Sequence, residues 1–422
     1  SFFRNQYLTP LCYNPYMRFS DLKKLKTEAP EPEPKKLARP APAPAREIVR
    51  PAAPAQREPA PLPPAAPPPA AAPLQEPARP ALTGSPKSRR EASALSSRAA
   101  KPPFKEMDAE ARELYSRVLD LSGSFLKSVD QPYTEKYEAV LAVCRLIIAS
   151  LREQGLLLSY TAYSTAEDYL RGHTANTAIM ALALGLEAGL PDSELQLLGF
   201  CAMAHDIGMT EYASLYNRAD RLGEKEFAEM SLHAEAGVAK LDRIVDIDYK
   251  IRDRARHIVL QTHERADGSG YPDRLSDEEI DPLAQYISIA DAYEAMTHPR
   301  AWREAVNPPD AVKELVEKEG RGFNSKAVKA LLSSVSIYPP GSLVALSTGE
   351  IAGVVRVTRG FLTKPLVEIL MDSQFSQLTP QHLDLFEHPL TSIERSVTFR
   401  EVETNNPKFA AKLEMSRWWV EW

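Results

Sequence analysis

The sequence has few cysteines, and none of them lie at a spacing that is typical of a zinc site. Cys12, Cys144 and Cys201 are too few for a disulfide framework, and no CxxC pair occurs. Because disulfides form mainly outside reducing compartments, this cysteine usage predicts a cytoplasmic protein.

Long apolar runs are also missing. No unbroken stretch approaches the roughly 20 apolar residues that a transmembrane helix needs. The first residues, Ser1 to Gln6, lack the basic-then-apolar order of a signal peptide. We therefore expect no membrane insertion.

Net positive charge is absent from the part of the chain that is expected to fold. The whole chain carries −6, but residues 31–101 hold 12 Lys/Arg against 6 Asp/Glu, so the remainder carries −12. Domains that bind nucleic acid are usually basic. This charge argues against a nucleic acid polymer as partner, while a small anionic ligand held by metal ions and a few arginines stays compatible with it.

Glycine is nearly absent from a long proline-rich segment. Residues 30–103 hold 21 of the 36 prolines and one glycine, Gly84. Such a segment buries too little apolar surface to fold, so we expect residues 28–103 to form a disordered, stiff spacer. The preceding residues 1–27 are rich in aromatic side chains, and they are either a docking segment for a protein partner or a disordered tail.

Apolar residues recur at helical spacing over most of the remaining chain. We expect a helical subdomain over 104–160, with helices at 106–127 and 135–154. A second domain over 161–335 is predicted to be helical near 165–188, 192–207, 224–242, 247–263, 282–297, 308–319 and 324–334. Strands that alternate with crossover helices are not indicated, which excludes doubly wound and barrel folds.

The pattern changes towards period two after residue 336. Strands are predicted near 342–347, 350–358 and 365–371, with turns at Gly349 and Gly360. We therefore expect a mainly α protein with a small antiparallel β appendage over 336–422. The apolar end, residues 418–422, is expected to pack on the domain or on another subunit.

Metal-competent side chains recur on successive predicted helices. A lone histidine on a helix is more often a satisfied core or surface residue than a ligand, and we interpret His257, His298, His382 and His388 in that way. The joint occurrence of the others predicts one shared metal site, made by His173, His205, Asp206, His233, His263 and Asp291. Imidazole with carboxylate suits Fe, Mn, Ni or Zn, and a bridging aspartate between histidines is one way to build a two-metal site.

A glycine-rich loop follows His263. Gly268 and Gly270 allow backbone angles that a Cβ would forbid, and Pro272 restricts the residue before it. One interpretation is that the loop holds the ring of Tyr271 beside His263. The alternative is the end of a helix followed by an ordinary turn.

These motifs resemble the HD-GYP family, a branch of the HD phosphohydrolases that cleaves cyclic di-GMP. His205-Asp206-Ile207-Gly208 matches the HD motif, and the stretch from His263-Glu264-Arg265 to Gly270-Tyr271-Pro272 matches the second motif. The resemblance covers about residues 160–335. It implies an HD-type helical bundle and a cyclic di-GMP phosphodiesterase that uses two divalent metals, with Fe or Mn expected first and Ni or Zn as alternatives.

The resemblance also implies roles for individual residues. One metal would be held by His173, His205, Asp206 and Asp291, and the other by Asp206, His233 and His263. His205 and Asp206 would be catalytic. Gly270, Tyr271, Arg300 and Arg303 would bind the substrate, with the arginines on its phosphates. Glu264 and Asp267 would fix the loop.

Three positions depart from the family pattern. Thr262 replaces the first histidine of the His-His-Glu motif, which should weaken the second metal. Met209 replaces a lysine that contacts phosphate. Tyr169 replaces a glutamate that allows a third metal in some members, so two metals at most are expected.

Three functions are therefore compared. The first is an active phosphodiesterase that opens cyclic di-GMP to pGpG, and on to GMP. The second is a degenerate domain that binds cyclic di-GMP or a protein partner without turnover, which Thr262 and Met209 favour. The third is an HD hydrolase that acts on another nucleotide.

Overall fold

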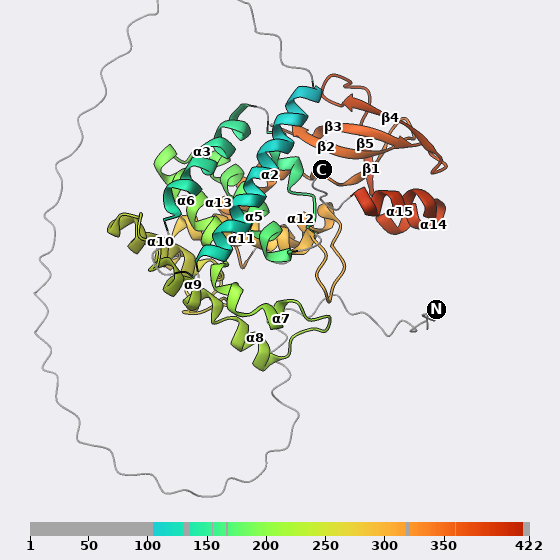
Figure 1. Cartoon of the computed structure of the whole chain (residues 1–422). Helices are drawn as coiled ribbons and strands as arrows, with labels where there is room; N and C mark the ends of the chain where they lie inside the picture. The colour runs from blue at the N-terminus through green and yellow to red at the C-terminus, as the bar shows by residue number, and fades with distance from the viewer. Residues whose placement is uncertain are drawn as a thin grey trace, which may run out of the picture. The chain divides into compact units, whose positions relative to one another are not determined.

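The computed structural model (Figure 1) describes residues 104–129, 131, 135–153, 155–165, 168–317, 321–358 and 360–416. The aromatic segment 1–27, the proline-rich segment 28–103 and the C-terminal tryptophans lie outside these residues, as do the predictions made for them. In the part of the chain that is described, no helix has the length and apolarity needed to cross a membrane.

Most of the described chain is helical, which confirms the predicted mainly α fold. The helices in chain order are α2 (Phe104–Ser128), α3 (Tyr137–Glu153), α4 (Leu157–Tyr160), α5 (Tyr169–Glu187), α6 (Asp192–Ala204), η2 (Ile207–Glu211, a 3-10 helix), α7 (Ala213–Tyr216), α8 (Glu224–Met230), α9 (His233–Leu241), α10 (Tyr249–Gln261), η3 (Asp277–Glu279, a 3-10 helix), α11 (Pro282–Thr297), α12 (Pro308–Glu317) and α13 (Ser325–Val335).

One apolar core runs through this helical part, from Ala111 on α2 to Val335 on α13. At its centre is α5, which is buried nearly all round and packs against α2, α6, α11 and α13 (Figure 1). A helix that is apolar on every side is expected at the centre of a core. Because α2 and α3 share this core, the boundary predicted at residue 161 separates segments that pack together, and the predicted domain division stays a prediction.

The helix predicted over 224–242 is divided. Its first part, α8, ends at Met230, and α9 starts again at His233. The interruption puts His233 at a helix start, where its Nδ1 lies 2.8 Å from the carbonyl oxygen of Met230. Apolar periodicity alone does not reveal such a break, because both parts keep the same pattern.

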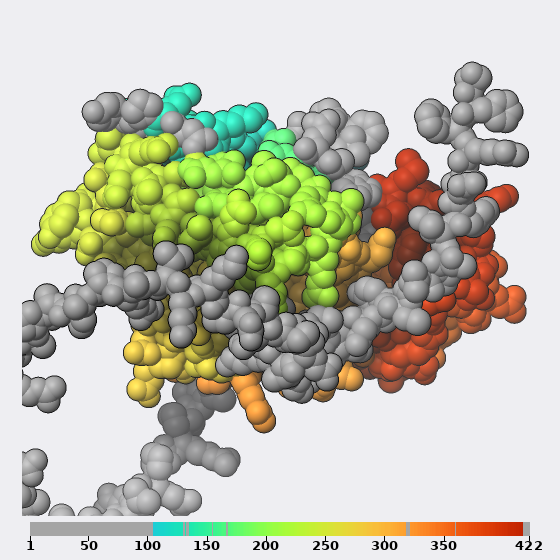
Figure 2. All heavy atoms as spheres, turned by 90° about the horizontal axis from the view of Figure 1, so that it is seen from below, coloured from blue at the N-terminus to red at the C-terminus, as the bar shows by residue number. Residues whose placement is uncertain are grey.

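The part around α7 and α8 lies at the surface. Neither helix contains a fully buried residue. In the space-filling view this green segment forms part of the outer face (Figure 2).

A five-stranded antiparallel sheet follows the helices. Its strands are β1 (Leu343–Leu346), β2 (Ile351–Thr358), β3 (Phe361–Met371), β4 (Gln377–Asp384) and β5 (Ile393–Val397), in the order β4-β3-β2-β1-β5. The antiparallel β appendage was predicted, but β4 and β5 were missed. Most of β4 is exposed and polar, so it carries no apolar alternation to detect.

Two helices that the sequence analysis did not predict complete the described chain: α14 (Phe399–Asn405) and α15 (Pro407–Ser416). They pack against the sheet, because Val402 and Phe409 share an apolar cluster with Ile351 and Met371. Val344 and Val367 belong to a second cluster, built around other strand residues. Alternate strand residues thus enter different clusters, as the period of two requires.

Candidate metal centre

The predicted ligands lie on five segments that meet in the helical core. His173 is in the second turn of α5, whose first turn is capped by the carboxylate of Asp168 on the backbone N–H of Arg171. His205 and Asp206 lie between α6 and η2, and Asp291 is in the middle of α11. All of the predicted ligands are buried, each at most 8% exposed: His173, His205, Asp206, His233, His263 and Asp291.

Gly208 explains how the His-Asp turn can lie so close to α9. A Cβ on Gly208 would be 1.9 Å from the carbonyl oxygen of His233 and 2.6 Å from the backbone nitrogen of Gly237. Only glycine permits this approach of two backbones. The contact brings His233 next to Asp206, although the two residues are on separate helical segments.

Asp206 has one oxygen on each side of the cluster. Its Oδ1 lies 3.3 Å from Nε2 of His233 and 3.3 Å from Nε2 of His263. Its Oδ2 lies 3.4 Å from Nε2 of His173 and 3.6 Å from Nε2 of His205. Two groups of possible metal ligands result, which share Asp206.

The separations between these atoms suit ligands of a common ion. Bonds to a transition metal are about 2.1 Å long, so ligand atoms at right angles lie about 3 Å apart. The Nε2 atoms of His233 and His263 are 2.8 Å apart, and Nε2 of His173 is 3.2 Å from Oδ1 of Asp291. Asp291 is nearest to His173, and its other oxygen lies 3.7 Å from Nδ1 of His263.

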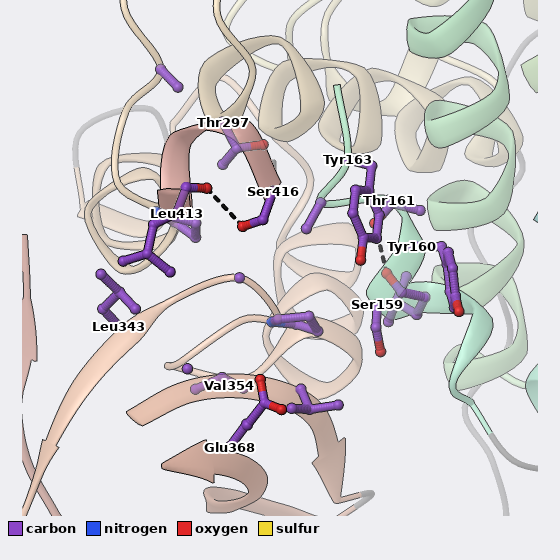
Figure 3. Close-up of a pocket in the computed structure, with 18 of the residues that line it drawn as sticks. Ser159, Tyr160, Thr161, Tyr163, Thr297, Leu343, Val354, Glu368, Leu413 and Ser416 are labelled. Carbon is purple, nitrogen blue, oxygen red and sulfur yellow. Dashed lines mark hydrogen bonds between the residues drawn. The ribbon is translucent and has the colours of Figure 1, made fainter. Parts of the chain in front are cut away.

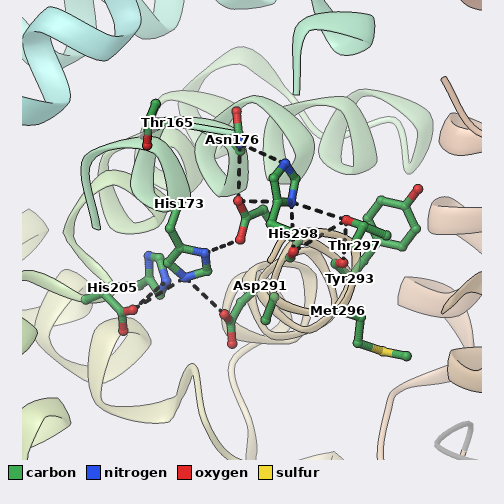
Figure 4. Close-up of polar contacts among 12 residues, drawn as sticks. Thr165, His173, Asn176, His205, Asp291, Tyr293, Met296, Thr297 and His298 are labelled. Atoms are coloured by element: carbon green, nitrogen blue, oxygen red, sulfur yellow. Dashed lines mark hydrogen bonds and ion pairs between the residues drawn. The ribbon is translucent and has the colours of Figure 1, made fainter. Parts of the chain in front are cut away.

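Three of the histidines are oriented by contacts of their other ring nitrogen, and Figure 4 shows the contacts of His173. The Nδ1 atoms of His205 and His233 each lie 2.8 Å from a backbone carbonyl oxygen, and Nδ1 of His173 contacts the carboxylate of Glu294. Since these acceptors take the Nδ1 protons, each Nε2 is left with its lone pair towards the cluster.

Two buried atoms of the cluster lack a hydrogen-bond partner among the described residues: Nε2 of His205 and Oδ1 of Asp206. Buried polar atoms nearly always have partners, so such orphans need an explanation. A bound cation would satisfy both atoms. The residues therefore fit a metal centre by their donor types, their spacing and their unsatisfied atoms.

The charge state of the carboxylates fits the same interpretation. Burial alone would raise the pKa of Asp206, but the surrounding histidines, His205 first, hold it well below the ordinary value. Burial is likewise outweighed at Asp291, where contact with His173 lowers the pKa to about 2. Both side chains are anionic at neutral pH and suited to a cation.

Glu294 was missed as a site residue by the sequence analysis. It is 1% exposed, and besides its contact with His173 its Oε1 accepts a 3.1 Å hydrogen bond from Nδ2 of Asn176 and lies 3.2 Å from Nδ1 of His298. Asn176 in turn accepts a hydrogen bond from the hydroxyl of Tyr115 on α2. The sequence signal that could have identified Glu294 is its position one helical turn after Asp291 in an otherwise apolar helix.

His298 is a buried core histidine, as predicted, although it belongs to this polar network. Along with Tyr293 and Thr297 it also lines a cavity of about 1040 Å³ whose other walls come from α2, α4, the sheet and α15 (Figure 3). None of the predicted metal ligands lines this cavity, so it is separate from the cluster.

The loop after His263 holds an aromatic ring against that histidine. The rings of Tyr271 and His263 are stacked, with centroids 5.1 Å apart and an interplanar angle of 11°. Gly268 has a positive φ of 72°, as expected for a turn glycine, whereas Gly270 is needed for space. A Cβ on Gly270 would be 2.5 Å from the carbonyl oxygen of His263.

Glu264 fixes the same loop. Its buried carboxylate accepts hydrogen bonds from the backbone nitrogens of Asp273, Arg274 and Leu275, at 2.7, 3.0 and 3.0 Å. Asp267 holds the loop tip by accepting from the backbone nitrogen and the hydroxyl of Ser269. Both contacts have the loop-fixing form that the resemblance implied.

The family departures are visible in the geometry. The hydroxyl of Thr262 donates a 2.9 Å hydrogen bond to the carbonyl oxygen of Val259 in its own helix. It is therefore not turned towards the metal ligands. Met209 is buried. Tyr169 stacks on His173, with ring centroids 5.3 Å apart.

Comparison with protein-family models matches residues 161–326 to the HD domain. Residues 161–326 form an HD domain of the HD-GYP family. The HD-GYP domain is followed by a match of residues 343–405 to a KOW domain associated with the HD domain. The sequence analysis predicted strands in that region without a family.

Curated relatives of the HD-GYP domain are phosphodiesterases by name. A cyclic di-GMP phosphodiesterase of Pseudomonas aeruginosa is 29% identical over 234 residues, 55% of this chain and 55% of the relative. A 3'3'-cGAMP-specific phosphodiesterase of Vibrio cholerae is 29% identical over 190 residues, 44% of this chain and 36% of the relative. The chain thus spans about half or less of these relatives.

A solved structure of Bd1817, a HDG"Y"P protein from Bdellovibrio bacteriovorus, is 17% identical to this chain. The similarity has a TM-score of 0.45 and covers 58% of this chain and 76% of that chain.

Proposed function

We propose that the HD-GYP domain is a metal-dependent phosphodiesterase that hydrolyses cyclic di-GMP to pGpG, and on to GMP. The observation that carries this proposal is the placement of the two Asp206 oxygens between two groups of histidines. The names of the relatives support the reaction class, since several are cyclic di-GMP phosphodiesterases.

Two divalent ions, Fe or Mn first and Ni or Zn as alternatives, would be held by residues of this centre. His173, His205 and Asp291 would serve one ion, His233 and His263 the other, and Asp206 both. Such a pair supplies a polarised phosphate and an activated water when it is bound. His205 and Asp206 would be catalytic because they would hold the metal ions that activate the water.

The substrate would be positioned by residues around the centre. Tyr271 offers a ring that is already oriented by stacking on His263, and Gly270 permits that orientation. Arg300 would meet a phosphate through its planar guanidinium. Arg303 would contribute less, because its guanidinium is hydrogen-bonded to the carbonyl of Ala295.

The deciding experiment combines metal analysis with turnover. The full chain is purified, loaded anaerobically with Fe²⁺ or with Mn²⁺, and given cyclic di-GMP, with the products separated by chromatography. We expect pGpG or GMP to form in proportion to the bound metal. Loaded protein that leaves cyclic di-GMP intact would exclude the proposal.

A degenerate binding domain is the second candidate, and the geometry of Thr262 favours it. With this hydroxyl turned to its own helix, the second ion would have two histidines and one carboxylate oxygen. Binding of cyclic di-GMP to metal-loaded protein without product formation would establish this candidate.

A different cyclic dinucleotide is the third candidate, since one relative is named a 3'3'-cGAMP-specific phosphodiesterase. Parallel assays with cyclic di-GMP and 3'3'-cGAMP distinguish the two substrates. The ratio of the two kcat/KM values is the result that decides between them.

We infer a reducing cytoplasm as the compartment, because Cys144 and Cys201 are free thiols in the core. A protein partner for residues 1–27 stays a proposal that rests on their aromatic composition. Deletion of residues 1–103 with turnover unchanged, but with loss of a co-purifying protein, would support such a partner.

A further inference from the structure

The two arginines that follow α11 have different surroundings. The Arg303 guanidinium is tied to the end of α11 through the carbonyl of Ala295. The Arg300 side chain has no ion pair and no hydrogen bond to any described residue. Its guanidinium carbon lies 3.8 Å from the centre of the Tyr169 ring, which is a cation–π contact. The hydrogen-bond donors of Arg300 are therefore available to a ligand.

Tyr169 joins this arginine to the metal centre. It is the first residue of α5, one turn before His173, and the two rings are stacked at 5.3 Å with an interplanar angle of 18°. A single tyrosine thus contacts a predicted metal ligand and an unpaired guanidinium. The Tyr169 ring thus lies between the Arg300 guanidinium and the His173 ring. An anion bound at the metal centre would be close to this guanidinium.

The hydroxyl of Tyr169 is buried and has no hydrogen-bond partner among the described residues. A buried hydroxyl without a partner is destabilising, so packing alone would favour phenylalanine at this position. An un-ionised phenol can donate one hydrogen bond, and none of the described residues accepts one from Tyr169.

We propose that Tyr169 is a ligand-positioning residue whose ring holds the Arg300 guanidinium beside the metal centre and whose hydroxyl donates to the same anionic phosphate group. That the anion is the phosphodiester of a cyclic dinucleotide rests on the proposed function. The geometry itself requires only a phosphate oxygen next to His173 and Arg300.

The test measures the binding of inorganic phosphate to the Mn²⁺-loaded full chain by titration calorimetry. Tyr169→Phe removes the hydroxyl and keeps the ring, whereas Tyr169→Leu removes both. Arg300→Gln removes the cation, and Tyr249→Leu is the control at an exposed tyrosine that also begins a helix. Metal content is determined for every variant.

We expect Tyr169→Phe to weaken phosphate binding about threefold to tenfold, the usual effect of one neutral hydrogen bond. Tyr169→Leu should weaken it further, and its effect should shrink in the Arg300→Gln background, because the ring acts partly through that arginine. The control and the metal content should match the unmodified chain.

The inference is overturned if the unmodified chain does not bind phosphate, if Tyr169→Phe binds it equally well, or if Tyr169→Phe loses metal. If Tyr169→Leu does not fold, Tyr169→Phe alone decides. Hydrolysis of cyclic di-GMP is measured separately on the unmodified chain. Weakened phosphate binding in the variants, without such hydrolysis, would keep this inference and exclude the proposed function.

Discussion

Asp206 is the residue on which both candidate metal positions depend, because each of its oxygens faces a different pair of histidines. Removing its carboxylate takes a ligand from both positions at once. It also leaves four imidazoles without the anion that attracts a cation. The role of this residue can be measured without any assay of turnover.

Asp206→Ala should reduce bound Mn to less than about a tenth of the wild-type amount. Loss of a residue behind a ligand already weakens a metal site by about 10- to 100-fold, and Asp206 is itself a predicted ligand of both ions. Elemental analysis of the purified protein gives the metal content. His257→Ala is the matched control, because this histidine is exposed on α10 and does not contact the cluster. Equal metal in Asp206→Ala and wild type would contradict the predicted centre.

Thr262→His should strengthen the weaker position, since it restores a histidine next to His263. The expected result is a lower concentration of Mn²⁺ for half-saturation of the second ion, by about tenfold. Thr262→Val is the control, because it keeps the volume and offers no ligand atom. Metal titration followed by calorimetry distinguishes the two variants, and identical titrations would show that position 262 lies outside the ligand sphere.

The residues of this centre were predictable from the sequence to different degrees. The donors stood out because their residue types recur on successive helices. Glu294 did not, since its place one helical turn after Asp291 indicates a shared helix face but not a contact with His173. Sequence also could not show that Arg300 and Arg303 differ, because the difference comes from Tyr169 and from the carbonyl of Ala295, which lie on separate helices.

At the scale of elements, the contact between the His-Asp turn and α9 determines the shape of the cluster. The turn carries His205 and Asp206, α9 begins with His233, and Gly208 lies against the first turn of α9. Any enlargement of this glycine must move one backbone away from the other. The movement would separate His233 from Asp206.

Gly208→Ala should lower the free energy of unfolding by at least about 2 kcal/mol, because the new methyl group would overlap a backbone carbonyl in a packed core. It should also reduce metal content. Gly223→Ala is the control, since the nearest atom to its new Cβ would be 3.6 Å away. Denaturant unfolding of both variants gives the comparison, and equal stabilities would show that the turn can shift freely.

Element types were easier to predict than element ends. Buried helices such as α5 and α11 follow from long apolar segments, and the antiparallel pairing of β1 to β3 follows from period-two patterns. The break between α8 and α9 and the polar strand β4 were missed. Both depend on contacts far along the chain, which local periodicity does not contain.

At the scale of the whole molecule, the centre lies within the core that holds α2 to α13 together. A ligand that binds the folded state and not the unfolded chain stabilises the fold by about 2.7 kcal/mol at a hundredfold excess over its Kd. We therefore expect Mn²⁺ to raise the Tm by several degrees and EDTA to reverse this rise. Calorimetry of the wild type and of Asp206→Ala tests it, and an equal rise in both would place the binding elsewhere.

The buried contacts of Glu294 with His173 and His298 predict that stability depends on pH in the acid range. Burial acts to raise the pKa of Glu294, but the neighbouring His298 and His173 outweigh it and hold the pKa below the ordinary value of 4.5. Since the folded pKa is the lower one, the stabilisation is present above 4.5 and is lost as the pH falls further. Urea unfolding at several acid pH values should show a steeper loss for wild type than for Glu294→Gln.

The shared carboxylate of Asp206 has a consequence for how the protein fills with metal. Occupation of either position would fix the rotation of this side chain and so prepare the remaining oxygen for the second ion. The second ion should then bind more readily than the same position would bind an ion in the empty protein. The weaker position beside Thr262 would gain most, because its neighbour has already oriented the ligand that the two positions hold in common.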